Sequence, residues 1–242
     1  MRAALPGSLL RWAALAAATA VPRAAGAQPP AQDLMARLAT YAAHFETLRT
    51  QATYSLEGRL ETLDRGGRAD SVKDMRARIE PDDGTRVKVV VLKYTEDGED
   101  KTDDARRKAR ERASRPKSDK KPVRMPLLAQ EQSRYVFDEV EVDRADPSRV
   151  RIAFAPKVPE EDTIEGSAWV DAKAGTLISA GFRLTKTPLF VDYVNFTVKF
   201  GEPTALGPAV STVLVEGKGG LPFFQKRFRA QATLSDYRLA PL

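Results

Sequence analysis

The chain has 242 residues, of which 42% are hydrophobic, a formal net charge of +6 and no cysteine. The missing cysteines exclude disulfides, thiolate metal sites, cysteine nucleophiles and a lipidated cysteine. The single histidine, His44, leaves little for a zinc site or for general-base catalysis near neutral pH, and we expect it to be structural or solvated.

Residues 1–27 have the pattern of a cleavable export signal. Arg2 and Arg11 precede an apolar stretch, and Ala25-Gly26-Ala27 provides small residues for cleavage. The apolar stretch is shorter than the ~20 residues that span a bilayer. The sequence therefore predicts a periplasmic protein whose residues 28–242 form a single domain.

A single amphipathic helix opens this domain. Apolar residues recur every three or four positions from Gln32 to Leu48, which is typical of a helix with one buried face. Pro29-Pro30 suits the start of a helix.

After the helix, the hydrophobic period changes to two, which predicts strands joined by short turns. Short separators favour hairpins over β-α-β crossovers. We therefore predict an α+β fold: a large curved antiparallel sheet, a half-barrel of about nine or more strands, with the N-terminal helix on its concave side. The expected strands cover residues 54–60, 72–79, 85–94, 135–142, 150–155, 164–171, 177–185, 190–200, 210–216 and 223–234.

Residues 95–125 form a charged segment with almost no apolar residue, so we expect a flexible insert that adds nothing to the core. Within it, 103–115 can be a solvated helix or disordered. Its basic residues are candidates for contact with an anionic membrane surface or an envelope protein, and no interleaved aromatics favour nucleic acid. These candidates are Arg106, Arg107, Lys108 and Arg110.

One helix cannot cover so wide a sheet, so its concave face either closes on itself or stays open as an apolar groove. Two apolar loops beside prolines are further candidates for membrane or partner contact, or cap the core; they contain Leu189, Phe190, Phe223 and Phe224. The candidate groove residues, most of which can equally be ordinary core, are Leu38, Phe45, Tyr54, Leu56, Val89, Val91, Phe137, Trp169, Phe182, Phe196 and Phe228.

No pattern for covalent chemistry, metal or cofactor emerges. The acidic runs Asp82-Asp83 and Glu160-Glu161-Asp162 lie beside prolines and are typical of solvated turns. A Walker-type phosphate loop and a G-x-S-x-G elbow are both absent from the sequence. We expect a protein without enzymatic activity, metal or cofactor.

The segment Gly166-Ser167-Ala168-Trp169-Val170-Asp171, followed by Gly175-Thr176-Leu177-Ile178, resembles a strand-turn-strand of the LolA/LolB-like family of outer-membrane lipoprotein-sorting proteins. The order of signal, helix, meander and further antiparallel strands is similar too. The resemblance implies a half-barrel whose apolar concave face receives the acyl chains of lipoproteins or lipids.

Two hypotheses follow. The first is a periplasmic carrier or chaperone that binds acyl chains of lipoproteins or lipids in an apolar groove. The second is a non-enzymatic envelope module with a fully packed sheet and a protein partner. A third hypothesis is a hydrolase that acts through two carboxylates, although nothing in the sequence singles out such a pair.

Overall fold

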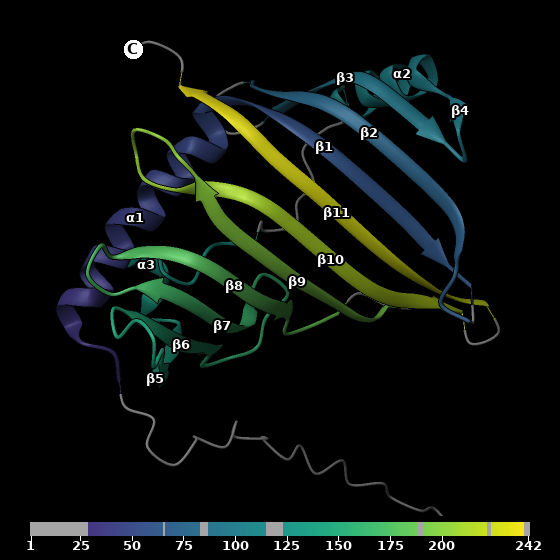
Figure 1. Ribbon diagram of the computed structural model, residues 1–242. Coiled ribbons are helices and arrows are strands. Elements are labelled where there is room, and N and C mark those ends of the chain that lie inside the picture. Colours follow the sequence, from purple (N-terminus) through teal and green to yellow (C-terminus); the bar gives the residue numbers. More distant parts are fainter. Residues whose placement is uncertain are drawn as a thin grey trace, which may run out of the picture.

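A computed structural model describes residues 29–64, 66–82, 87–114, 123–187, 191–221 and 224–239. Within these residues, eleven strands form one curved antiparallel sheet that is not closed, accompanied by few helices (Figure 1). The predicted α+β fold with a large antiparallel sheet and an N-terminal helix is confirmed. The predicted export signal lies outside the described residues.

The observed elements agree with most predicted ranges and add a two-residue strand and a one-turn helix. The helices are α1 (Gln32–Gln51), α2 (Thr102–Ala113) and α3 (Ala129–Gln132). The strands are β1 (Ala52–Leu63), β2 (Ala69–Pro81), β3 (Val87–Glu96), β4 (Glu99–Asp100), β5 (Tyr135–Val142), β6 (Arg149–Pro156), β7 (Ile164–Asp171), β8 (Thr176–Leu184), β9 (Val191–Glu202), β10 (Ala209–Leu221) and β11 (Phe224–Leu239).

The order across the sheet is β4-β3-β2-β1-β11-β10-β9-β8-β7-β6-β5. Strands that follow one another in the chain pair, as the short turns predict, except β4 and β5. In addition, β1 pairs with β11. Two meanders are therefore joined along the first and last long strands. The joining pair is long, because its register runs from Ala52 opposite Leu239 to Leu63 opposite Arg227.

Helix α1 is fixed to the sheet at widely separated points. Arg37 donates a hydrogen bond of 2.8 Å to the carbonyl of Ala172 in the turn between β7 and β8. In that turn Gly175 has a φ of +68° and lies against Arg37, so a side chain there would be strained and would collide with the arginine. Further along, the Tyr41 hydroxyl donates to the carbonyl of Pro208, before β10, at 2.6 Å. The helix is therefore held across several strands.

Side chains alternate between the two faces of the sheet. Because the strands are in register, one row of apolar residues crosses the concave face from β6 to β11: Ile152, Ala168, Ala180, Val198, Val213 and Ala232. On the outer face of β1 and β2, Arg76 pairs with Glu57 and Arg59 lies near Asp74. The apolar side therefore faces α1.

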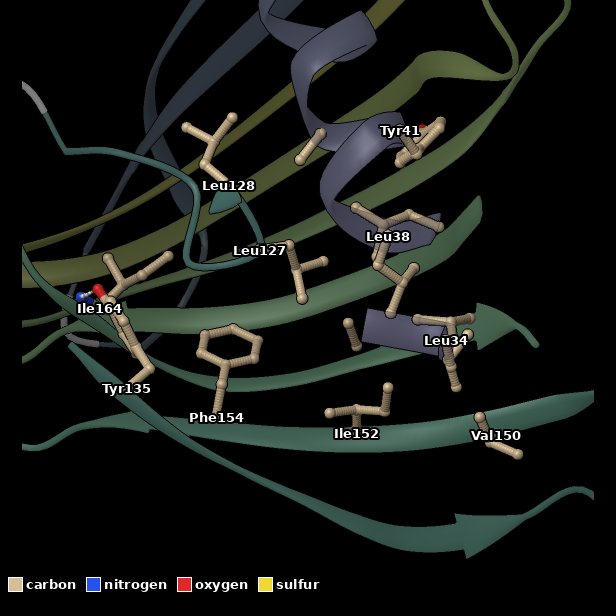
Figure 2. Packing of buried hydrophobic residues seen from close by; sticks show 14 residues of the cluster. Leu34, Leu38, Tyr41, Leu127, Leu128, Tyr135, Val150, Ile152, Phe154 and Ile164 are labelled. Carbon is tan, nitrogen blue, oxygen red and sulfur yellow. Dashed lines mark hydrogen bonds between the residues drawn. The ribbon is translucent and has the colours of Figure 1, made fainter. Parts of the chain in front are cut away.

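The main core lies between α1 and strands β5 to β8. Figure 2 shows Leu34 and Leu38 of α1 together with Leu127, all close to the side chains that rise from β6. Leu127 belongs to a segment that precedes α3, which we call the strap (residues 123–128). Its residues Pro126, Leu127 and Leu128 are buried. Two separate segments, α1 and the strap, therefore cover the core on the side opposite the sheet.

The charged segment 95–125 is partly ordered. Its described part contains β4 and α2, and α2 packs beside β3 with no buried residue (Figure 1). The helical alternative for residues 103–115 holds over Thr102–Ala113. The expectation that the segment adds nothing to the core is wrong at its end, because Met125 packs against the main cluster.

Candidate functional site

A cavity of about 390 Å³ lies between the concave face, α1 and the strap. This volume is near the lower end of the range for small-molecule pockets. Of its 22 lining residues, 19 are apolar or aromatic. They are Phe45, Leu48, Tyr54, Val123, Met125, Pro126, Leu127, Phe154, Ile164, Ala168, Leu177, Ala180, Phe182, Val198, Phe200, Val210, Val213, Leu234 and Tyr237.

The hollow has a local cause in the sequence. Ala168 of β7 and Ala180 of β8 are direct cross-strand partners on the concave face, and both line the cavity. Two alanines side by side leave space that larger side chains would fill. Around this gap stand larger residues such as Phe154, Phe182 and Phe200, which form its walls.

The roof combines α1 with the strap. Phe45 of α1 meets Phe200 edge to face, with ring centroids 5.8 Å apart. The strap is tied to α1 by Gln132, whose amide donates to the carbonyls of Met35 at 3.1 Å and Leu127 at 3.0 Å. One side chain therefore holds both parts of the roof together.

An ionic network lies behind the strap. Arg134 donates to Glu131 and Glu160 at 2.7 Å and to Asp162 at 2.9 Å, and its pKa is raised, chiefly by Asp162. Arg124 of the strap also reaches Glu131, at 3.4 Å. The solvated-turn expectation for Asp162 is wrong, because Arg134 compensates this carboxylate and allows its burial.

Three charged residues complete the lining: Glu46, Arg49 and Arg124. The two arginine side chains remain about half exposed, so they mark where the apolar cavity meets solvent. Arg49 donates to one oxygen of Glu46 through Nε at 3.0 Å and through a terminal nitrogen at 2.7 Å. The cavity thus has an apolar body and a charged mouth.

Two stacked tyrosines form another part of the wall. The rings of Tyr54 and Tyr237 lie 4.7 Å apart at an angle of 20°. Burial raises the pKa of both phenols, and Arg49 offsets part of this rise at Tyr54. The Tyr237 hydroxyl donates to the carbonyl of Val210 at 3.0 Å. Both phenols stay neutral near pH 7.

The predicted groove residues divide into four groups. Three line the cavity: Phe45, Tyr54 and Phe182. Leu38 and Phe137 pack in the main core. On the concave face beyond the cavity are Leu56, Val89, Val91, Phe196 and Phe228. Trp169 belongs elsewhere, as described next. Ligand binding by any of them stays a prediction.

The prediction that Trp169 lies in the groove is wrong. Its chain neighbours Ala168 and Val170 face the core, so Trp169 points to the outer face, where Arg151 lies over its ring at 5.9 Å. In a strand with apolar residues on both faces, size alone did not reveal the buried face.

Sequence reasoning missed the strap and the aromatic residues Phe200 and Tyr237. The one usable signal was Met125-Pro126-Leu127-Leu128, the first apolar run after the charged segment. The apolar loop residues Leu189, Phe190 and Phe223 lie outside the described residues, as does the side chain of Phe224.

The predicted basic residues lie on α2. Arg106 donates to the carbonyls of Val91 at 3.0 Å and Leu92 at 3.2 Å, which fixes the helix to β3. Arg107 pairs with Asp104, and Lys108 and Arg110 are exposed. Arg106 thus has a structural contact, whereas the others face solvent.

Within the described ranges, no three histidine, cysteine or acidic side chains gather as a metal site would require. None of the helices described is both long and apolar enough for a bilayer crossing. His44 is exposed on α1 and is not among the residues that line the cavity.

Comparisons with known proteins point to solved structures alone. No protein-family model matches the chain, and a search of curated proteins found no match. The matched structures include the LolA superfamily protein NE2245 from Nitrosomonas europaea, with 11% identity, 84% of this chain and 93% of that chain covered, and a TM-score of 0.38. A LolA superfamily protein is therefore among the solved structures to which this chain is similar, and the sequence resemblance was to the LolA/LolB-like family.

Two further neighbours have different descriptions. A DUF1329 family protein from Desulfovibrio piger shares 13% identity, with 88% and 94% of the two chains covered and a TM-score of 0.41. The complex of MucA and MucB from Pseudomonas aeruginosa contains a chain with 13% identity, coverage of 85% and 99%, and a TM-score of 0.25.

Proposed function

We propose that this protein is a non-enzymatic periplasmic carrier or chaperone that holds an acyl chain of a lipoprotein or lipid in its cavity. The observation that carries this proposal is the cavity itself: about 390 Å³ of space under α1 and the strap, with an almost wholly apolar lining. Such an apolar hollow is costly when only water fills it, because its walls then remain apolar surface in contact with water.

The energetics suit reversible transport. Each methylene that leaves water contributes about 0.8 kcal/mol, so about ten methylenes give about 8 kcal/mol before the cost of association. A free energy of this size supports binding that is firm and still reversible. Transfer then needs no catalytic group, only a difference in affinity between donor, carrier and acceptor.

The second candidate is an envelope module that binds a protein. A fully packed sheet has no place for this cavity, which favours the carrier. The apolar residues beyond the cavity favour a protein partner, because Leu60 is 36% exposed on the concave face. Only the carrier requires an acyl chain in the cavity, so ligand uptake separates the two functions.

The deciding experiment is titration of delipidated protein with a fluorescent fatty acid, followed by competition with a lipopeptide. Saturable uptake supports the carrier, and uptake no better than that of an unrelated protein rejects it. Ala180→Phe should fill the cavity and weaken uptake at least about tenfold, a change of about 1.4 kcal/mol. Ser179→Phe is the matched control, because the neighbouring residue of β8 faces the other side.

A further inference from the structure

The mouth of the cavity carries a feature that an apolar chain does not need. Its charged lining residues are two arginines and one glutamate, from α1 and from the strap. An acyl chain alone would be served by an uncharged rim, so the arginines point to the head group of the ligand.

Arg124 has an incompletely compensated charge. Its contact is with Glu131, at 3.4 Å, whereas Arg134 holds the same carboxylate at 2.7 Å. Arg134 also has Glu160 and Asp162, but Glu131 is shared between two guanidinium groups. Within the part of the chain that the structure describes, Glu131 is the acceptor found for Arg124, so its other N–H groups are free to turn to a ligand.

Arg49 is the second donor. Among the described residues, Arg49 donates through Nε and one terminal nitrogen to a single oxygen of Glu46, so its remaining terminal nitrogen is available. Glu46 also lines the cavity and opposes an anion there. The lining itself thus contains two arginines and one glutamate, and Glu131, which contacts Arg124 from outside the lining, is shared with Arg134.

From this arrangement we propose that the cavity selects amphiphiles with one anionic head group, a carboxylate or a phosphate, which Arg124 binds with help from Arg49 while the acyl chain enters the apolar body. This inference rests on the proposed function, since it concerns the same cavity. It adds the charge of the ligand, which the apolar lining alone leaves open.

The test compares single-chain amphiphiles on the delipidated full chain. Palmitate and a lysophosphatidylglycerol carry the anionic head, and monopalmitoylglycerol is the neutral reference. Charge-assisted hydrogen bonds imply that the anions bind about tenfold or more tightly than the reference. The preference should shrink at high salt, because the arginines are half exposed. The two anions distinguish carboxylate from phosphate recognition.

Variants assign the effect to the arginines. Arg124→Gln should weaken anion binding about tenfold and leave the neutral amphiphile unchanged, whereas Arg124→Lys should restore part of the affinity. Glu46→Gln should act in the opposite direction and tighten anion binding a few-fold, since it removes the opposing charge. Arg149→Gln is the control, because Arg149 pairs with Asp146 away from the cavity lining.

Equal binding of all three amphiphiles, unchanged in Arg124→Gln, would overturn this inference and leave the carrier function intact. Binding of none of them would overturn both. Urea unfolding of each variant establishes that it is folded. A preference for anions that survives Arg124→Gln and Arg49→Gln together would also reject the assignment to these residues.

Discussion

Two regions of the same concave face differ in their cover. Over β5 to β8, α1 and the strap bury side chains completely, as at Leu38 and Val170, both with 0% exposure. Towards the far ends of β1, β9, β10 and β11, the strands run past α1 (Figure 1). The apolar residues there, which we call the open strip, are only half buried or exposed; they are Leu60, Val194, Phe196, Val215 and Phe228.

The two regions share one alternating pattern, so the pattern does not decide burial. Leu60 faces Ala230 across the β1–β11 pair in the same way that Ile152 faces Ala168 across β6 and β7. What differs is the chain above them: a helix fixed at Arg37 and Tyr41, and a strap fixed by Gln132. The covering segments, α1 and the strap, come from elsewhere in the sequence, and their presence or absence makes one region core and the other surface.

The largest expected effect contrasts the two regions with one chemical change. Leu38→Ala should lower the free energy of unfolding by about 2–5 kcal/mol, because it opens a hole among fully buried neighbours. Leu60→Ala should cost less than about 1 kcal/mol, because solvent already reaches this side chain. Urea unfolding measures both. Equal losses would mean that the open strip is covered in solution.

The ranges of the strands could be predicted from the sequence better than their pairing. The predicted range Ile164–Asp171 matches β7 to the residue, because turn sequences bound this strand at both ends. The β1–β11 pair was not predicted, because turn residues report only on pairing between chain neighbours.

The candidate site was harder to predict. Ala168 and Ala180 face each other only once the β7–β8 register is known, so the hollow could not be located. The strap was missed because Met125 ends a charged segment, where a short apolar run gives no periodic signal.

A second contrast uses pH in the covered region. Burial raises the pKa of Tyr41, whose hydroxyl donates to the carbonyl of Pro208. The phenol therefore ionises in the unfolded chain above about pH 10 but stays neutral in the folded one. The stability from this residue is fully present below about pH 10 and is lost by about 1.4 kcal/mol per pH unit above it.

Tyr41→Phe tests this dependence, since phenylalanine cannot ionise. At pH 7 the variant should be about 1 kcal/mol less stable, because it loses the hydrogen bond. Above about pH 10 the gap should close and then reverse. Urea unfolding at pH 7, 10 and 11 measures it, and a constant gap would contradict a buried phenol.

A smaller effect concerns the attachment of the strap. Gln132→Ala removes the hydrogen bonds to Met35 and Leu127 and should cost about 1–2 kcal/mol. It should also speed exchange of a bound fluorescent fatty acid, because the strap lines the cavity. Ligand dissociation followed by stopped flow measures this. Gln130→Ala, an exposed neighbour in α3, is the control and should exchange at the original rate.

The smallest effect on stability is expected on α2, which lies beside β3 at the edge of the sheet away from the covered region (Figure 1). If α2 contacts an anionic membrane, each basic residue near the surface contributes about 1 kcal/mol. Replacing Arg107, Lys108 and Arg110 by Gln should then weaken binding to phosphatidylglycerol vesicles about a hundredfold or more in low salt.

This triple variant leaves Arg106, which holds α2 on β3, in place, so the fold and the uptake of fatty acid should not change. Co-sedimentation with phosphatidylglycerol and phosphatidylcholine vesicles gives the readout. Loss on the anionic vesicles alone would mean that the β3–β4 edge of the sheet, where α2 lies, meets the membrane. Undiminished sedimentation of the variant would mean that α2 is a solvated helix, and that any membrane contact is made elsewhere on the chain.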